Sequence, residues 1–305
     1  MTRLDLFFFI ANRRDLKRFA LYMLFLVASG TAANSQEREK PRNETATEHS
    51  FSRIAGVPYS DGKHGPLLAD LFLPANKALH PAVIFLHGGA WRIGDRTQLQ
   101  DVAVSLADEG YVGMAIDYDM TDKGDRFPVP LEEGEQAVAW LRKNAEKYQV
   151  DPRRIAVAGS SAGGELAALI ALDRRPILGA DVQAAIIFNG VLDLSDIGPD
   201  PENMVAPYLG GSCAAKFELC KRASPVFQVH GGAPPFFVGH GTADRVVPYS
   251  QAEHFVNLLR GEHVQVTPFV AKDAGHTYWN TNVWFKANIE AVLAFLHAAM
   301  PSREF

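Results

Sequence analysis

The sequence predicts an α/β protein with one mostly parallel sheet of about eight strands, helices on both faces and a small cap insertion. Short apolar runs alternate with longer segments of helical periodicity along most of the chain. Several of the runs are apolar throughout, as strands buried on both faces are. The 305 residues are 47% hydrophobic and 21% charged, which is enough for one large core.

The strands are expected in two groups. Residues 51–59 and 67–73 read as antiparallel edge strands, the second of which ends at Pro74. The remaining strands are expected to be buried and parallel, at 81–86, 111–118, 155–158, 182–188, 235–239 and 264–270. Helices are expected between them, at 97–109, 131–148, 162–172, 249–260 and 281–299.

Residues 193–232 break this alternation. They show no clear periodicity and are rich in Pro, Gly and Ser. A stretch of this length without regular structure is usually a functional lid or an insertion. We therefore expect a partial cap over the strand ends, where open α/β sheets bind their ligands. Cys213 and Cys220 lie within it and are close enough to form a disulfide loop in an exported protein, with two free thiols as the alternative.

The N-terminal residues have the pattern of a targeting segment. Basic residues between positions 13 and 18 precede an apolar run at 19–28 that is too short to span a membrane, and small residues follow. We expect residues 1–33 to be a signal peptide, or else an uncleaved anchor, and 34–50 to be a polar linker. We expect residues 51–305 to form the folded domain, which would be exported and either secreted or periplasmic.

Charge and motifs exclude several classes of function. The net charge of −5 gives no support to nucleic-acid binding. The chain contains no CxxC or HExxH pattern, so neither a metal nor an organic cofactor is expected.

One motif carries chemistry. The stretch from Gly159 to Gly163 spells G-x-S-x-G between a buried strand and an apolar helix, which is the pattern of a nucleophile elbow around Ser161. The glycines permit a turn tight enough to lift the serine hydroxyl clear of the sheet. Ser160 lies outside the motif register and is taken as structural. Because small-residue turns occur in many α/β proteins, the pattern needs partners elsewhere in the chain.

Those partners follow other strands. Asp244 and His276 come after later strands, in the chain order Ser, Asp, His that characterises one class of acyl hydrolase. Ser161 would be the nucleophile, His276 the general base, and Asp244 the group that orients His276. Backbone N–H groups would bind the oxyanion, and the candidates are Gly88, Gly89 and Ala162.

Alternative roles remain open at this stage. Asp193 also follows a strand and is a second candidate for the acid, whereas Asp273 lies too close to His276 in sequence to orient it easily. His87 is expected to brace the oxyanion loop, and His240 to pack at its strand end. Aromatic residues near the strand ends either line a substrate pocket or pack in the core; they are Trp91, Phe127, Tyr278 and Trp279.

These motifs resemble a known superfamily. The quoted stretches are H-G-G-A-W with Gly94-Asp95 after it, D-P-R-R-I, G-S-S-A-G-G, H-G-T-A-D and the final A-G-H. Together they are similar to the α/β-hydrolases over about residues 69–299, and within them to secreted bacterial feruloyl and acetylxylan esterases and to hormone-sensitive-lipase-like carboxylesterases. The chain departs from these at Ala90, where a third glycine is frequent, at Asp119, where the arginine of a Tyr-Arg pair is usual, and at Glu165, where histidine is frequent.

The resemblance implies a serine hydrolase that cleaves carboxylic esters through an acyl-enzyme. It further implies a short acyl or hydroxycinnamoyl ester of a plant polysaccharide or small alcohol as substrate. An amide hydrolase with the same triad, such as an arylformamidase or an exopeptidase, remains an alternative because the elbow does not distinguish ester from amide. A non-catalytic binding protein on the same scaffold is a further alternative, although such proteins usually lose a triad residue.

Overall fold

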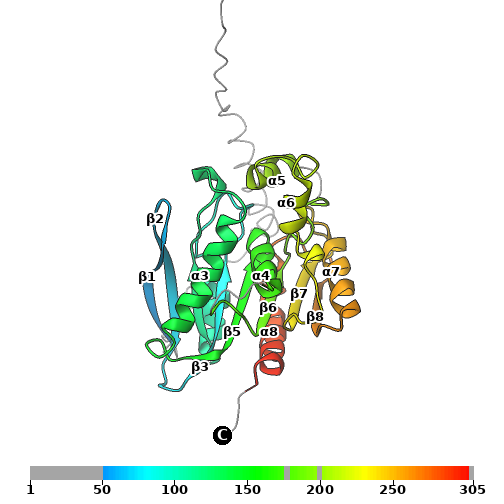
Figure 1. Cartoon of the computed structure of the whole chain (residues 1–305). Helices are drawn as coiled ribbons and strands as arrows, with labels where there is room; N and C mark the ends of the chain where they lie inside the picture. The colour runs from blue at the N-terminus through cyan, green and yellow to red at the C-terminus, as the bar shows by residue number, and fades with distance from the viewer. Residues whose placement is uncertain (1–50, 175–178, 198–200, 302–305) are drawn as a thin grey trace, which may run out of the picture. The chain divides into compact units, whose positions relative to one another are not determined.

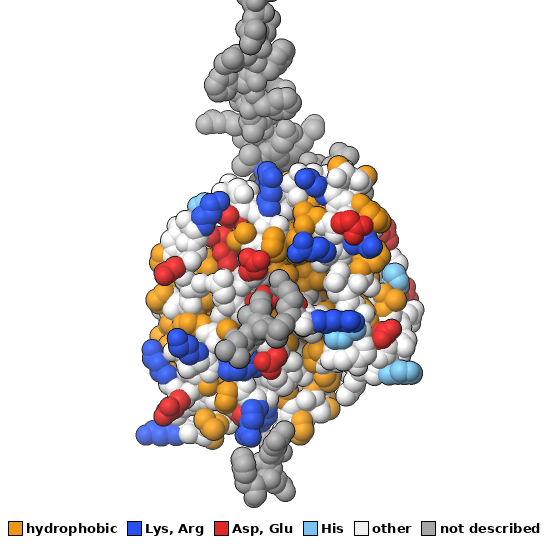
Figure 2. Space-filling model, in the orientation of Figure 1, with side chains coloured by type: hydrophobic (Ala, Val, Ile, Leu, Met, Phe, Trp, Pro, Cys, Tyr) orange, Lys and Arg blue, Asp and Glu red, His pale blue; other side chains and the backbone are white. Residues whose placement is uncertain are grey.

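The computed structural model describes residues 51–174, 179–197 and 201–301 (Figure 1). The predicted signal peptide at 1–33 and the linker at 34–50 lie outside the described residues. No helix among the described residues is both long enough and apolar enough to cross a membrane. On the face shown in Figure 2, the described basic and acidic side chains are interspersed and are not gathered into one basic patch.

A single eight-stranded sheet forms the centre of the domain, with the strand order β1-β2-β4-β3-β5-β6-β7-β8. The first two pairings, β1 with β2 and β2 with β4, are antiparallel, and all the others are parallel. The predicted fold class is therefore confirmed. The strands are β1 (Phe51–Gly62), β2 (Gly65–Pro74), β3 (His80–Leu86), β4 (Val112–Ile116), β5 (Val150–Ser160), β6 (Ala184–Phe188), β7 (Phe236–Gly241) and β8 (Val266–Ala271).

Burial along the strands explains why the central ones read as continuous apolar runs. Every residue of β4 and β6 is buried, because helices cover both faces of the sheet there. The edge strand β1 is mostly exposed or half-buried, and it is the more polar sequence.

Five helices cover the sheet in two layers, each with its own core (Figure 1). On one face, α2 (Gln100–Asp108) and α8 (Phe285–Ala299) bury residues such as Leu106 and Val292. On the other, α3 (Val129–Lys143), α4 (Ala162–Leu172) and α7 (Tyr249–Gly261) bury residues such as Leu166 and Phe255. The helices expected from the sequence are present, with ends that differ by a few residues.

The cap segment, 193–232, contains regular structure that its sequence did not reveal. It holds α5 (Pro201–Leu209), α6 (Phe217–Arg222) and the short 3-10 helix η2 (Pro225–Phe227). The helix α6 is only six residues long and α5 carries Pro207 in its interior, so neither has the sequence pattern of an uninterrupted helix. Figure 1 shows α5 and α6 beyond one end of the strands.

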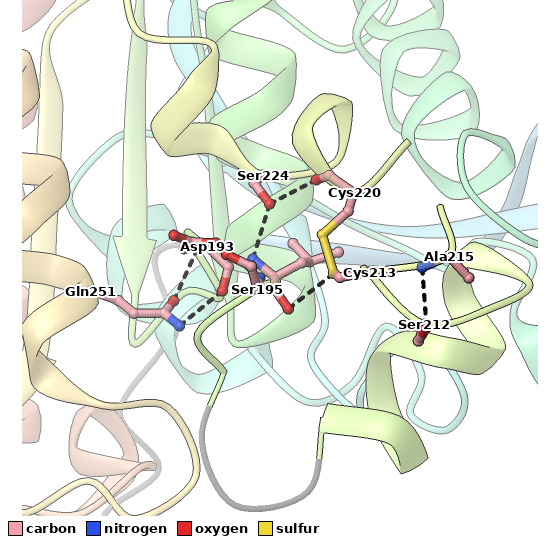
Figure 3. The surroundings of a disulfide bond; sticks show 9 residues. Asp193, Ser195, Ser212, Cys213, Ala215, Cys220, Ser224 and Gln251 are labelled. Carbon is pink, nitrogen blue, oxygen red and sulfur yellow. Dashed lines mark hydrogen bonds between the residues drawn. A yellow bond between two sulfur atoms is a disulfide. The ribbon is translucent and has the colours of Figure 1, made fainter. Parts of the chain in front are cut away.

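Covalent and polar contacts hold the cap together (Figure 3). Cys213 and Cys220 form a disulfide with an S–S distance of 2.05 Å. The hydroxyl of Ser224 donates to the carbonyl oxygen of Cys220 at 2.8 Å and accepts the N–H of Leu194 at 3.0 Å. Gln251 on α7 donates to the carbonyl oxygen of Asp193 at 2.9 Å, so the start of the cap is tied to the helical layer beneath it.

The strand register brings distant loops to one edge of the sheet. Leu86 at the end of β3 pairs with Gly159 near the end of β5, and Ser160 pairs with Phe188 at the end of β6. Farther along, Phe188 pairs with Gly239 in β7. Because these strands are parallel, the loops that follow them all leave the sheet on the same side. The segments that carry the chemical motifs therefore meet there.

Candidate active site

Ser161 stands on a strained turn between β5 and α4. Its φ of 56° and ψ of −119° are a conformation that side-chain-bearing residues rarely adopt. A Cβ atom added to Gly159 would lie 2.0 Å from the carbonyl oxygen of Gly163, and one added to Gly163 would lie 2.1 Å from that of Leu86. Both contacts are impossible, so the turn requires glycine at each position. The elbow thus has the geometry that the G-x-S-x-G pattern predicts.

His276 lies against a buried carboxylate. Its Nδ1 is 2.7 Å from Oδ2 of Asp244, while Oδ1 of Asp244 accepts the N–H groups of Val246 at 2.8 Å and Val247 at 3.0 Å. Burial by itself would raise the pKa of Asp244, but the hydrogen bonds and charges of His240 and His276 outweigh it and hold that pKa well below its usual range. An ionised Asp244 keeps the proton of His276 on Nδ1 and leaves Nε2 able to accept another.

A second histidine shares the same carboxylate. His240 Nε2 is 3.1 Å from Asp244 Oδ2 and 3.0 Å from the carbonyl oxygen of Val247. The sequence suggested only a packing role for His240. The signal that could have indicated its contact with Asp244 is its place four residues earlier, in H-G-T-A-D. One N–H shared between these two oxygens restrains the carboxylate at Oδ2, whereas the Val246 and Val247 amides restrain it at Oδ1.

Asn189, which the sequence analysis missed, lies on the imidazole ring of His276. It follows β6, is fully buried, and its Nδ2 is 3.3 Å from Nδ1 and 3.2 Å from Nε2 of His276. An atom this close to both ring nitrogens must lie over the face of the ring, because a point in the ring plane at these distances would overlap Cε1. The in-plane lone pair of Nε2 therefore stays available for another partner. No motif surrounds Asn189 that could have flagged it.

The loop after β3 lies against Ser161, with one correction to the expected oxyanion donors. A Cβ atom on Gly88 would lie 3.1 Å from Cβ of Ser161. The N–H of Gly88, however, already donates to Oε1 of Gln98 at 2.5 Å, so it is not a free donor. The N–H of Gly89 has no acceptor among the described residues. Ala162 is the first residue of α4, where an N–H has no acceptor within the helix. The geometry therefore favours Gly89 and Ala162.

The alternative acids have other surroundings. Oδ1 of Asp193 accepts the N–H of Ser195 at 2.9 Å and its hydroxyl at 2.5 Å, which caps a local turn. Asp273 has a left-handed backbone with φ 58° and donates its N–H to the hydroxyl of Thr242. Among the described carboxylates, Asp244 is the one that contacts His276.

The family model that matches this chain covers residues 69–259, which includes the oxyanion loop, the elbow and Asp244. The chain belongs to the BD-FAE family. Its eight-stranded sheet with antiparallel β1 and β2 is the α/β-hydrolase fold that the motifs implied.

Curated relatives of this BD-FAE protein include two esterases of Mycobacterium tuberculosis. Esterase LipQ is 32% identical over 266 residues, which are 80% of this chain and 62% of LipQ. Esterase LipC is 35% identical over 215 residues, which are 65% of this chain and 53% of LipC. The chain thus spans between about half and two thirds of the length of these relatives.

Solved structures resemble the BD-FAE domain over nearly their whole length. The thermophilic esterase Est2 of Thermogutta terrifontis superposes with a TM-score of 0.71 at 25% identity, covering 84% of this chain and 95% of Est2. A truncated carbohydrate esterase from gut microbiota superposes with a TM-score of 0.70 at 21% identity, covering 82% of this chain and 98% of that one. The second likeness concerns the fold.

The tryptophans suggested as pocket residues are instead part of the BD-FAE core. Trp91 is fully buried, donates from Nε1 to Oε2 of Glu165 at 3.0 Å and stacks on Tyr208 with ring centroids 4.1 Å apart. Trp279 is 2% exposed and packs on Phe188. Both rings lie under the loops and not at a surface open to substrate. The other aromatic candidates, Phe127 and Tyr278, are buried as well.

One group of potential metal ligands lies outside this constellation. His64, Asp119 and Asp125 have ligand atoms within 4.8 Å of one another. Their charges are already matched, because Asp125 pairs with His64 at 2.6 Å and with Lys63 at 3.2 Å, and Asp119 lies 3.8 Å from Lys123. Ion pairs account for this cluster, and the departure at Asp119 belongs to it.

Proposed function

We propose that this chain hydrolyses carboxylic esters through an acyl-enzyme formed on Ser161. The observation that carries the proposal is the 2.7 Å contact between His276 and the buried Asp244, on the same edge of the sheet as the strained serine turn. The esterase relatives support the reaction class.

In the proposed reaction each proton transfer has a named partner. His276 accepts the proton of the Ser161 hydroxyl at Nε2 as the oxygen attacks the ester carbonyl. The resulting imidazolium is stabilised by Asp244, and the oxyanion is bound by the N–H groups of Gly89 and Ala162. The imidazolium then protonates the leaving alcohol. A water molecule, deprotonated by the same nitrogen, attacks the acyl-enzyme. The imidazolium then returns that proton to the Ser161 oxygen as the acid is released.

Short acyl esters are the substrates we propose first, with hydroxycinnamoyl esters of plant polysaccharide as the second class. Est2 of Thermogutta terrifontis, 26% identical to this chain, has been solved with propionate and with butyrate bound. As part of the same proposal, the signal-peptide pattern in residues 1–33 supports export, which would place the enzyme among extracellular esters.

A burst experiment tests the function. Purified protein is mixed with p-nitrophenyl acetate, p-nitrophenyl octanoate and methyl ferulate, and labelled in parallel with a fluorophosphonate. Ser161→Ala should abolish both turnover and labelling. Ser160→Ala is the matched control, since this neighbour is buried in β5 and should keep both.

The outcomes separate two kinds of error. Turnover that survives in Ser161→Ala would refute the proposed nucleophile. Labelled Ser161 without turnover of any ester would refute the ester preference while keeping the triad, and matched anilides would then be compared. The ranking of acetate, octanoate and ferulate decides between the two proposed substrate classes.

A further inference from the structure

Glu165 is a buried carboxyl group one helical turn from the nucleophile. Its N–H donates to the carbonyl oxygen of Ser161 at 3.1 Å, which opens α4, and its side chain is fully buried. No arginine, lysine or histidine among the described residues pairs with it. Burial raises the pKa of Glu165 well above its usual range, although hydrogen bonds from Trp91 and Tyr208 oppose this. Burial therefore disfavours the charged form of this carboxyl group.

Two other segments converge on this side chain. Trp91, in the loop after β3, donates its indole N–H to Oε2 at 3.0 Å. The hydroxyl of Tyr208, on the cap helix α5, lies 3.3 Å from both carboxyl oxygens. The rings of Trp91 and Tyr208 stack with centroids 4.1 Å apart and planes 4° apart. One buried group thus joins the nucleophile helix, the oxyanion loop and the cap.

The oxyanion loop needs such a support because its backbone is strained. Ala90 and Trp91, directly after Gly89, both have φ of 55°. A side-chain-bearing residue in this region costs on the order of 1–3 kcal/mol and persists only where its surroundings hold it. The bond to Glu165 and the stack on Tyr208 restrain Trp91. They thereby fix the peptide of Gly89, two residues earlier, whose N–H is one of the two favoured oxyanion donors.

We infer that Glu165 is a positioning residue that locks the oxyanion loop and the cap helix α5 onto the nucleophile helix. This inference rests on the proposed function and extends it, because it makes docking of the cap through Tyr208 a condition for a correctly placed oxyanion donor. Docking of the cap then affects turnover. Glu165 itself does not touch the reacting atoms.

The test compares variants that keep or remove the two hydrogen bonds. Glu165→Gln retains an acceptor for Trp91 and a neutral group of the same shape, so kcat should stay within about threefold of wild type. Glu165→Leu fills the volume but accepts no hydrogen bond, so kcat on p-nitrophenyl acetate should fall about 10- to 100-fold with little change in KM. Tyr208→Phe removes only the hydroxyl contact with Glu165, keeps the ring that stacks on Trp91, and should lower kcat about 3- to 10-fold.

Ser224→Ala is the matched control, since it removes buried hydrogen bonds inside the cap without touching Glu165. It should leave kcat near wild type. Equal losses in Ser224→Ala and Tyr208→Phe would overturn the inference, because they would show a general loss of cap stability. Wild-type kcat in Glu165→Leu, or a loss in Glu165→Gln as large as in Glu165→Leu, would overturn it too. If Glu165→Leu does not fold, the contrast between Tyr208→Phe and Ser224→Ala decides the matter.

The rate of Ser161 labelling by a fluorophosphonate separates this inference from the proposed function. Phosphonylation also develops negative charge on an oxygen that the oxyanion donors bind. The labelling rates should therefore follow the same order as kcat across the variants. They can be measured even if the tested esters are not the natural substrates. A labelling rate that is equal in wild type and Glu165→Leu would refute the positioning role by itself.

Discussion

Asp244→Asn is the substitution that tests the triad most directly, because the structure fixes what the new amide would face. Oδ1 of the side chain accepts the N–H groups of Val246 and Val247, so an asparagine would keep its oxygen there. Its NH₂ group would then replace Oδ2, which lies 2.7 Å from His276 Nδ1 and 3.1 Å from His240 Nε2. A donor would thus meet two groups that must themselves donate.

The imidazole of His276 relieves this clash by moving its proton to Nε2, and there it can no longer accept the proton of Ser161. The corresponding change in the chymotrypsin-type triad lowers kcat about 10⁴-fold through the wrong tautomer. We expect a loss of about 10³- to 10⁴-fold in kcat/KM here, equivalent to about 4–5.5 kcal/mol of transition-state stabilisation. The shape of the side chain is unchanged, so the fold should survive.

Stopped-flow turnover of p-nitrophenyl acetate measures this loss, with circular dichroism to show that the variant is folded. Asp193→Asn is the matched control, because Asp193 was the alternative acid and caps a turn within the cap segment. It should retain activity within a few-fold of wild type. A kcat/KM for Asp244→Asn within tenfold of wild type, or an equal loss in Asp193→Asn, would refute the assigned triad.

Three further predictions concern the loop, the cap and pH. Gly89→Ala should lower kcat/KM at least 100-fold, because a Cβ there would lie 1.8 Å from the carbonyl oxygen of Ile93. Gly65 is the control, since it has a similar φ of 122° with open space around it, and Gly65→Ala should leave turnover unchanged. A similar loss in both variants would point to backbone strain alone. Replacing both Cys213 and Cys220 by serine should lower the free energy of unfolding, measured by urea denaturation, by about 2 kcal/mol, since the bridge closes a short loop with a sequence separation of 7. An unchanged urea midpoint would argue against the disulfide. Burial and the charges of Asp119 and Asp125 raise the pKa of Glu133 to about 7, so the stability from its protonation is complete below about pH 4 and is lost as pH rises through 7. Glu133→Gln mimics the protonated form, so at pH 8 it should raise the free energy of unfolding by up to about 3 kcal/mol, seen as a higher melting temperature. At pH 4 the melting temperature should not rise. Equal shifts in melting temperature at the two pH values would contradict this prediction.

Much of the candidate site could be predicted from the sequence because its signals are local. The glycines at 159 and 163 are required by contacts within one turn, and such contacts leave a fixed spacing in the chain. The buried strands are apolar on both faces, so their ends, and the polar residues after them, could be placed without coordinates. Asp244 and His276 were found in this way. The cap helices were missed because α6 is only six residues long and α5 has a proline, Pro207, in its interior.

Tertiary structure alone decided which side chains meet. Trp91 and Glu165 are 74 positions apart, and Tyr208 is another 43 positions from Glu165, so no spacing records their contact. Nothing in the sequence distinguished a tryptophan held in the core by a carboxyl group from one that lines a pocket, because both are aromatic residues beside a strand end. The same holds for the N–H of Gly88, which Gln98 occupies, and for Asn189 on the ring of His276. The sequence by itself determined the sheet, the elbow and the chain order of the proposed triad, since these follow from local backbone geometry and burial. The oxyanion donors and the support beneath them depend on contacts between distant segments, and those form only when the sheet register brings the loops together.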